Sequence, residues 1–364
     1  MQNGRQCGLL KRLISTLNFR WLSVLIILEC AGLAGLSTFS AGDQLATFTG
    51  FPPATSWAYQ LQNIDIQALE RTDHDVLVID YSADGGEDSE FTASDIARLK
   101  TKPDGQRRTV LAYLSIGEAE DYRFYWKKEW AVTPPTWLGE LDPEWPGNYT
   151  VRYWSAGWQS LILGKSDGYL HKILAANFDG VYLDRVDGFL AWQDHVEDAE
   201  GLMKGFVRRL AADARKEQPG FLIVQQNAEN LLAEHAYRDL IDAVAKEDLI
   251  YGLEGDAVRN HPESISEAIF FLNDMRNQGK PVFVVEYGLN GRQQSCAKSE
   301  ITELGYIALF AERALADIPG NVGSVDIAGC AKRSGVSDDG RQNVIEKAFS
   351  KFSSNRSGAG KAIP

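Results

Sequence analysis

Apolar segments of strand length recur eight times along this 364-residue chain, and helical patterns lie between them. The eight segments lie at residues 56–62, 75–82, 108–117, 178–187, 220–230, 242–252, 280–288 and 321–329. Two of them contain the runs VLVID and VFVVE, which are typical of parallel strands buried on both faces. Eight strands alternating with helices over about 280 residues predict an α/β fold, a single (β/α)8 barrel.

Helical patterns support this order. The segments 199–217 and 262–279 have apolar residues at helical spacing, and a third helix is predicted over 299–320, ending at Pro319 and Gly320. An open, doubly wound sheet is the alternative architecture. That fold usually binds its ligand with a glycine-rich phosphate turn, and the chain contains no G-x-G-x-x-G motif.

A long segment, residues 118–177, separates the third predicted strand from the fourth. It is rich in aromatic residues, among them Trp137, Trp145, Trp154 and Trp158. Long loops in compact domains are usually functional. The rings are of the kind that stacks on sugar faces, or they anchor the loop by packing on the barrel.

Polar side chains end nearly every predicted strand. They are carboxylates, carboxamides and tyrosines: Gln60, Asp80, Tyr81, Glu118, Asp184, Asp187, Gln226, Asn227, Glu229, Glu247, Asp248, Glu286, Tyr287 and Asp326. In a parallel barrel the carboxyl ends of the strands share one face, where chemistry collects. Such groups hydrogen-bond sugar hydroxyls, and two acids can cleave a glycosidic bond. The alternative is a solvated rim, which would also contain lysine, serine and threonine.

The N-terminal segment differs from the rest. Basic residues precede an apolar run at 21–42, which predicts an export signal, or an uncleaved membrane anchor, over residues 1–44. The barrel is then expected over 45–352, followed by a flexible tail over 353–364.

Four cysteines are present. Cys7 and Cys30 lie in the N-terminal segment, whereas Cys296 and Cys330 follow the seventh and eighth predicted strands. Neighbouring barrel strands bring such loops together, so an exported chain is expected to join Cys296 and Cys330 by a disulfide. Two free buried thiols are the alternative.

Charge and composition exclude several classes of function. The net charge is −13, and nucleic-acid binding requires a basic footprint instead. Only five histidines occur, none close to a cysteine, so we expect no metal site and no cofactor. The motifs of P-loop proteins, zinc proteases and serine hydrolases do not occur. A monomer acting on a glycan is expected.

The motifs AYLSIGEAEDYRFYW, GNYTVRYW, FDGVYLDRVDGF, QQNAENLL, KEDLIYG and VVEYG, in this order, resemble glycoside hydrolase family 114, the endo-α-1,4-polygalactosaminidase-like proteins. The resemblance covers roughly residues 52–330. It implies a TIM-like barrel, a secreted or surface location, and endo-acting hydrolysis of α-1,4-linked, galactosamine-rich polysaccharide.

The resemblance also implies two catalytic acids. One is Asp184, which closes the YLD strand, and the other is placed at Glu247 in KEDLIYG, with Asp248 and Glu254 as competing positions. We expect a retaining mechanism with Asp184 as nucleophile, held ionised by Asn227 and Tyr113, and with a partly buried Glu247 as acid/base.

Thirteen further residues are expected to bind the substrate: Gln60, Asp80, Tyr81, Tyr113, Glu118, Tyr122, Tyr153, Trp154, Asp187, Asn227, Glu229, Glu286 and Tyr287. Two alternative functions remain. The chain would be a non-catalytic carbohydrate-binding barrel at the cell surface, or a hydrolase of a different glycan.

Overall fold

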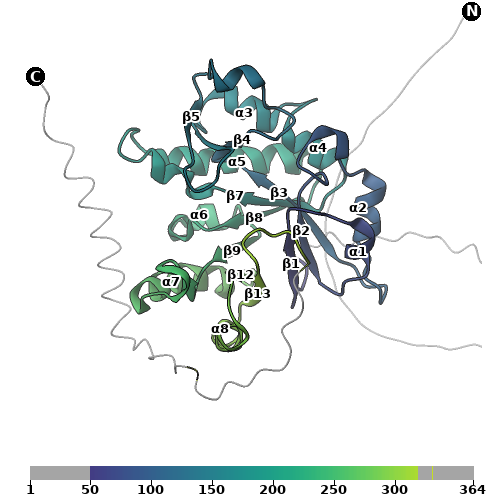
Figure 1. Cartoon of the computed structure of the whole chain (residues 1–364), viewed down its shortest axis with the longest axis vertical. Helices are drawn as coiled ribbons and strands as arrows, with labels where there is room; N and C mark the ends of the chain where they lie inside the picture. The colour runs from purple at the N-terminus through teal and green to yellow at the C-terminus, as the bar shows by residue number, and fades with distance from the viewer. Residues whose placement is uncertain (1–49, 319–329, 331–364) are drawn as a thin grey trace, which may run out of the picture. The chain divides into compact units, whose positions relative to one another are not determined.

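Eight parallel strands form one sheet in the computed structural model, which describes residues 50–318 and residue 330 (Figure 1). In order across the sheet they are β1 (Trp57–Gln60), β2 (Val76–Ile79), β3 (Thr109–Ser115), β7 (Gly180–Asp184), β8 (Leu222–Gln226), β9 (Ala243–Glu247), β12 (Val282–Tyr287) and β13 (Ile307–Ala311). Trp57 Nε1 donates to the carbonyl oxygen of Ile307 at 3.1 Å, so the first strand meets the last. The sheet is a nearly closed barrel, and the predicted fold class is confirmed.

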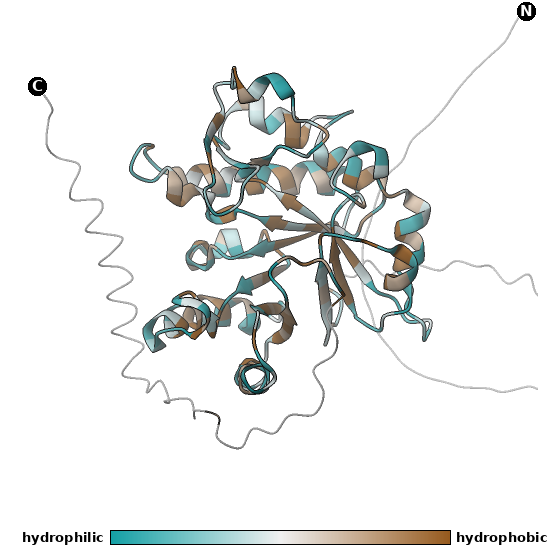
Figure 2. Ribbon diagram, in the orientation of Figure 1, coloured by the Kyte–Doolittle hydropathy of each residue, from teal (hydrophilic) through white to brown (hydrophobic). Residues whose placement is uncertain are grey.

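Helices connect the strands and surround them (Figure 1). They are α1 (Ile66–Glu70), α2 (Ala93–Leu99), α4 (Tyr169–Ala175), α5 (Ala199–Glu217), α6 (His235–Arg238), α7 (Pro262–Asn277) and α8 (Gly291–Glu303). Figure 2 shows the strands as largely hydrophobic and the outer helices as mixed. In α5 the buried residues recur at helical spacing, and the Asp198 side chain caps the first turn by accepting from Gly201 N.

The eighth strand is not where the sequence predicted it. The helix expected over 299–320 ends at Glu303, because Gly305 adopts a φ of 75° that reverses the chain. The run IALFA then forms β13, paired in parallel with β12. A short apolar run fits a buried strand or a buried helix equally well by periodicity, which explains the error. The strand predicted at 321–329, with Asp326, lies outside the described residues.

Two layers of apolar side chains hold the barrel together. One layer lies between the sheet and the helices, and the other fills the barrel interior. The interior layer is rich in rings: Tyr59 and Tyr182 lie 5.0 Å apart between centroids, and Trp57 packs 5.2 Å from Phe283. This packed interior forms a floor beneath the carboxyl ends of the strands.

The predicted insertion after β3 forms a small layer of its own. Its strands β4 (Glu118–Glu120), β5 (Leu138–Leu141) and β6 (Asn148–Val151) make an antiparallel sheet in the order β4–β6–β5, and α3 (Ala156–Leu163) follows. Most of its rings pack inward. Trp137 and Trp158 are buried with centroids 5.2 Å apart, which favours the anchoring role for these two rings.

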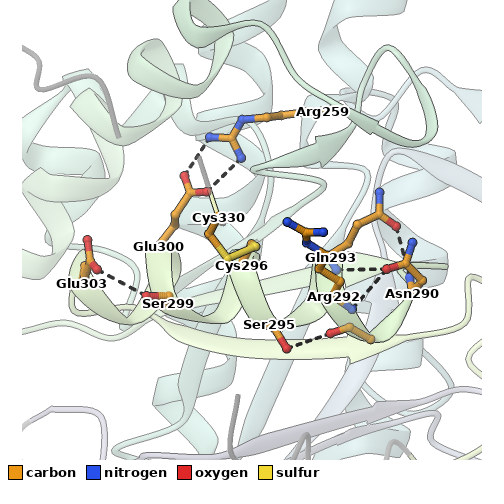
Figure 3. The surroundings of a disulfide bond; sticks show 11 residues. Arg259, Asn290, Arg292, Gln293, Ser295, Cys296, Ser299, Glu300, Glu303 and Cys330 are labelled. Carbon is orange, nitrogen blue, oxygen red and sulfur yellow. Dashed lines mark hydrogen bonds and ion pairs between the residues drawn. A yellow bond between two sulfur atoms is a disulfide. The ribbon is translucent and has the colours of Figure 1, made fainter. Parts of the chain in front are cut away.

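Cys296 and Cys330 form a disulfide, with their Cα atoms 5.4 Å apart (Figure 3). Cys296 lies in α8, where the neighbouring Glu300 accepts two hydrogen bonds from Arg259, at 2.9 and 2.8 Å. The cross-linked loop contains β13, the strand that closes the barrel.

The predicted N-terminal segment, residues 1–44, and the predicted tail, residues 353–364, lie outside the described residues. Across residues 50–318 no helix is long and apolar enough to cross a membrane.

Reduction of the disulfide should destabilise the barrel. The disulfide joins residues 34 positions apart. Such a link lowers the conformational entropy of the unfolded chain, which stabilises the folded state by about 3–4 kcal/mol. The melting temperature should therefore be lower in the presence of a reductant than in its absence. The double variant Cys296→Ser, Cys330→Ser should have the melting temperature of the reduced protein, and adding reductant should not change it. An unchanged melting temperature after complete reduction would contradict the prediction.

Candidate active site

A cavity of about 600 Å³ opens at the carboxyl ends of the barrel strands. Its walls come from the strand ends and from the insertion. The lining side chains that matter for chemistry are Tyr59, Asp80, Asp84, Tyr113, Glu118, Glu120, Tyr122, Arg123, Trp145, Asn148, Asp184, Arg185, Asp187, Gln226, Asn227, Glu247, Tyr287 and Arg313.

Two carboxyl groups face each other in this cavity. Asp184 ends β7 and Glu247 ends β9, while Gln226 ends β8, the strand between them. The amide nitrogen Nε2 of Gln226 lies 2.7 Å from Asp184 Oδ1 and 2.8 Å from Glu247 Oε2. These two inner oxygens are therefore no more than about 5.5 Å apart, which brings the two carboxyl groups into the close range found in pairs of a nucleophile and an acid/base.

Further donors hold each carboxyl group. Asp184 accepts from the Tyr113 hydroxyl at 2.7 Å and from the backbone N–H of Arg185, also at 2.7 Å. Glu247 accepts from the Tyr287 hydroxyl at 2.6 Å and from Asn227 Nδ2 at 2.9 Å. Tyr113 thus contacts Asp184 as expected, whereas Asn227 contacts Glu247 instead.

The environment favours protonation of the pair. Desolvation in the cavity, followed by the negative charge of Glu247, raises the pKa of Asp184. Desolvation also raises the pKa of Glu247, although hydrogen bonds from Tyr287 and Asn227 oppose the rise. Two like charges this close share a proton more readily than they both ionise, as an acid and a nucleophile in one site require.

Three arginines line the cavity, and each is neutralised twice over. Arg123 contacts Asp80 and Glu120, Arg185 contacts Glu118 and Asp142, and Arg313 contacts Asp248 and Asp256. Arg123 is almost fully buried, at 2.6 Å from each of its partners. Since each arginine faces two carboxylates, none of the three offers a free positive charge to a ligand.

The cavity wall is therefore acidic. Seven carboxylates line it against three arginines, and in the described part of the chain no ion pair holds Asp187. Burial and the nearby Asp142 raise the pKa of Glu118 to about 7, against the opposing charge of Arg185.

Nine of the predicted binding or catalytic residues line the cavity: Asp80, Tyr113, Glu118, Tyr122, Asp184, Asp187, Asn227, Glu247 and Tyr287. The competing acids do not line it. Asp248 pairs with Arg313 at 3.1 Å, and Glu254 is exposed.

Three of the other predicted binding residues support loops by bonding to the backbone. The Gln60 amide donates to the carbonyl oxygen of Gln62 at 2.9 Å, and the Tyr81 hydroxyl donates to that of Gly85 at 3.3 Å. Glu286 accepts from the N–H groups of Ile250 and Tyr251, at 2.7 and 3.0 Å.

The remaining three contact side chains or backbone away from the cavity. The Tyr153 hydroxyl donates to Ala199 O at 2.6 Å, and the Trp154 ring packs 5.3 Å from Trp192. Glu229 pairs with Lys246 at 3.5 Å. For all six residues the structure provides partners outside the cavity.

Several lining residues were not among the predicted binding residues, although Gln226 was noted at a strand end and Trp145 in the aromatic segment. Tyr59 and Gln226 sit on predicted strands, where alternation of side chains was the available signal. Arg123, Trp145 and Arg313 come from loops, where no local pattern indicates which side chains turn inward.

A close backbone contact holds the Asp184 end of β7. Arg185 has a left-handed backbone, with a φ of 57°, which directs its N–H to Asp184 Oδ1. Its carbonyl oxygen lies against Gly117, where a Cβ atom would be only 2.1 Å away. Only glycine leaves room for this contact at residue 117.

A parallel barrel with two facing, protonatable carboxyls at its carboxyl face has an arrangement that glycosidases use. The family model described as "Glycoside-hydrolase family GH114" matches residues 38–329. The chain belongs to this family and is a glycoside hydrolase, and the resemblance noted in the sequence is confirmed.

Three curated relatives are uncharacterized proteins. One from Methanocaldococcus jannaschii is 40% identical over 239 residues, 64% of this chain and 66% of that protein. One from Thermotoga maritima is 37% identical over 254 residues, 68% of this chain and 75% of that protein. One from Deinococcus radiodurans is 31% identical over 312 residues, 80% of this chain and 96% of that protein.

Solved structures share the fold at low identity. Aspergillus fumigatus Ega3, in complex with galactosamine, has a TM-score of 0.53 and 20% identity, over 73% of this chain and 95% of that one. The glycoside hydrolase domain of PelA from Pseudomonas aeruginosa has a TM-score of 0.56 and 18% identity, over 74% of this chain and 98% of that one.

The variant Gly117→Ala should weaken both the fold and the site. Its Cβ would meet Arg185 O at 2.1 Å, and overpacking of this kind costs about 1–3 kcal/mol. The Arg185 N–H would move away from Asp184, so turnover should also fall. Urea unfolding and initial rates measure the two effects.

The matched control is Gly205→Ala in α5, where a Cβ meets nothing within 4 Å. It should be neutral or up to about 1 kcal/mol more stable, because alanine is the better helix former. Equal behaviour of the two variants would contradict the role given to Gly117.

Proposed function

We propose that this protein is an exported, endo-acting, retaining glycoside hydrolase that cleaves α-1,4-linked, galactosamine-rich polysaccharide. The observation that carries the proposal is the pair Asp184 and Glu247, whose near oxygens one amide nitrogen holds within about 5.5 Å. Their place at the carboxyl face of a family 114 barrel supports a catalytic role for both.

The proposed reaction has two displacement steps. In the first, an electron pair of the Asp184 carboxylate attacks the anomeric carbon, and the bond to the leaving sugar breaks as its oxygen takes the proton of Glu247. In the second, Glu247 removes a proton from water, and the hydroxide formed displaces Asp184. Both carboxyls then return to their starting protonation states, and the product keeps the anomeric configuration.

The charge of the cavity favours a cationic or neutral sugar. Seven carboxylates face three arginines that are each paired twice. A sugar with a free ammonium group would be attracted, whereas a uronate would be repelled. The similar fold of Ega3, described in complex with galactosamine, agrees with an amino sugar. Asp187 is the residue we assign to the substrate ammonium, because no ion pair in the described chain occupies it.

Half-exposed rings at the rim favour a polymeric substrate. The side chains of Tyr122 and Trp145 are 49% and 46% exposed and line the same cavity. The Tyr122 hydroxyl donates to Glu120 at 2.6 Å, which fixes the ring. Fixed rings beside a cleavage site can stack on sugars either side of the bond that breaks.

Export fits the predicted N-terminal signal and the Cys296–Cys330 disulfide, which persists outside a reducing cytosol. A non-catalytic, carbohydrate-binding barrel would have no use for two carboxyls enclosed together. A hydrolase of another glycan would keep the pair and differ in the acidic wall, so substrate charge separates these alternatives.

Removal of either carboxylate should abolish turnover and spare the fold. In Asp184→Asn and Glu247→Gln, the rate on galactosamine polymer should fall on the order of 10²–10⁴-fold or more. Proton NMR of the first product should show the α anomer in the wild type, as retention requires. Near-normal turnover of either variant, or an initial β anomer, would overturn the mechanism.

The pH profile of the wild type should be bell-shaped. Since the pKa of Asp184 is raised, the acid limb should lie above the pH at which a free aspartate ionises, because protonated Asp184 cannot attack. Since the pKa of Glu247 is raised too, it keeps its proton until a higher pH and then gives the alkaline limb. Initial rates measured across the pH range test whether both limbs are shifted to higher pH.

Asp187 should discriminate between charged and neutral substrates. In Asp187→Asn, KM for a deacetylated polymer should rise about tenfold, the worth of one charged hydrogen bond. KM for the acetylated, neutral polymer should barely change. Added salt should raise KM of the wild type on the charged polymer.

The control Asp213→Asn, on α5 away from the cavity, makes the same change in net charge. Equal effects of both variants would refute the assignment.

A further inference from the structure

Gln226 is enclosed between the two carboxyl groups and touches both. Its side chain is only 3% exposed. The two hydrogens of its amide nitrogen point to two different acceptors, Asp184 Oδ1 at 2.7 Å and Glu247 Oε2 at 2.8 Å. No other residue in the described chain donates to both acids.

The hydrogen-bond partners assign the orientation of the amide. A reversed amide would place its own oxygen against two carboxyl oxygens, each of which already accepts a second N–H group and so has no proton to donate. The amide oxygen, Oε1, is buried and has no partner among the described residues. Contact with the acids therefore falls entirely to the nitrogen.

We propose that Gln226 is a positioning residue that sets the spacing of the two acids and leaves Asp184 Oδ2 and Glu247 Oε1 as the reacting oxygens. This inference rests on the proposed function and deepens it. It follows from how the donors divide between the four carboxyl oxygens.

The inner oxygens are fully occupied. Asp184 Oδ1 accepts from Gln226 and from the N–H of Arg185, and Glu247 Oε2 accepts from Gln226 and from Asn227. An oxygen that accepts two N–H bonds has no lone pair left in the carboxyl plane for a proton or an attack.

Each outer oxygen has a single partner, a tyrosine hydroxyl. Tyr113 donates to Asp184 Oδ2 at 2.7 Å, and Tyr287 donates to Glu247 Oε1 at 2.6 Å. A hydroxyl both donates and accepts and can rotate. When Glu247 Oε1 carries the proton, the Tyr287 oxygen accepts it as a hydrogen bond. When Oε1 has given the proton to the leaving oxygen, Tyr287 donates instead.

The strand geometry explains why residue 226 has this place. β8 lies between β7 and β9 in the sheet, and Val224, two residues earlier, faces the barrel interior. Gln226 shares that face by alternation. Gln225 faces the other way, where its oxygen accepts from Tyr237 at 2.6 Å.

Other charged and titratable groups also act on the pair from the surrounding elements. They are Tyr59 of β1, Tyr113 of β3, Tyr182 of β7, Arg185 and Asp187 after β7, Lys246 of β9, Asp248 after β9, Tyr287 of β12 and Arg313 after β13. All of these stay in place when only Gln226 is changed.

The test is Gln226→Met, which keeps the length of the side chain and removes the donor. Hydrogen bonds to an ionised carboxylate lower its pKa, so their loss should raise the pKa of both acids. Both limbs of the pH–rate profile should move to higher pH, and kcat should fall on the order of a hundredfold. A purely structural role would lower the rate without moving the limbs.

The matched control is Tyr237→Phe, which removes a buried hydrogen bond to Gln225 on the outer face of the same strand. It should lower the melting temperature while both limbs stay in place. Gln226→Asn is the second variant. Its shorter arm reaches one acid at most, so its limbs should move less than those of Gln226→Met.

Carboxyl titration by ¹³C NMR, without substrate, separates the two proposals. If the wild type cleaves no amino-sugar polymer, the proposed function fails, and the titration still tests Gln226. Upward shifts of the Asp184 and Glu247 resonances in Gln226→Met support the inference. Unchanged titration and unchanged limbs in both Gln226 variants would overturn it, even with an active wild type.

Discussion

The candidate site depends on holding two carboxyl groups together in a partly buried position at the mouth of the barrel. An isolated ionised carboxyl in such a place is strongly unfavourable, and a second one beside it makes this worse. Here Asp184 and Glu247 receive six hydrogen bonds, two of them from Gln226 and the others from Tyr113, Arg185, Asn227 and Tyr287. These donors lie on or just after β3, β7, β8 and β12. A closed parallel barrel is a natural solution, because it brings the ends of distant strands to one face.

The floor and the insertion complete this environment. Small residues, Ala243 and Ala245, lie below Glu247 on the inner face of β9, and the rings of Tyr59 and Tyr182 fill the space beneath the pair. The insertion adds Arg123, whose charge Asp80 and Glu120 hold at 2.6 Å each. Rings below the acids and buried ion pairs beside them replace much of the surrounding water, so the two acids interact strongly with one another.

Much of this was readable in the sequence, and the misassigned residues at the ends of β1 and β12 share one physical cause. Strand runs such as VLVID and VFVVE indicated the barrel, and polar strand ends indicated the face that carries the site. A strand end does not by itself show which of two neighbouring side chains faces inward. In β12 Tyr287 faces the interior while Glu286 bonds to a loop, and in β1 Tyr59 faces inward while Gln60 bonds to a loop. Alternation from the buried interior residues would have separated each pair.

Long-range charge pairing was beyond sequence reasoning, and it decides what the cavity can bind. Arg123, Arg185 and Arg313 come from three separate loops, and each meets carboxylates far away in the chain, such as Asp80 for Arg123 and Glu118 for Arg185. Counted from sequence alone, three arginines at the barrel mouth would suggest an anionic ligand. Once each is paired with two carboxylates, its charge is more than balanced, and the wall attracts cations. By charge alone, such a wall is expected to favour an amino sugar over a neutral sugar and to disfavour an acidic glycan.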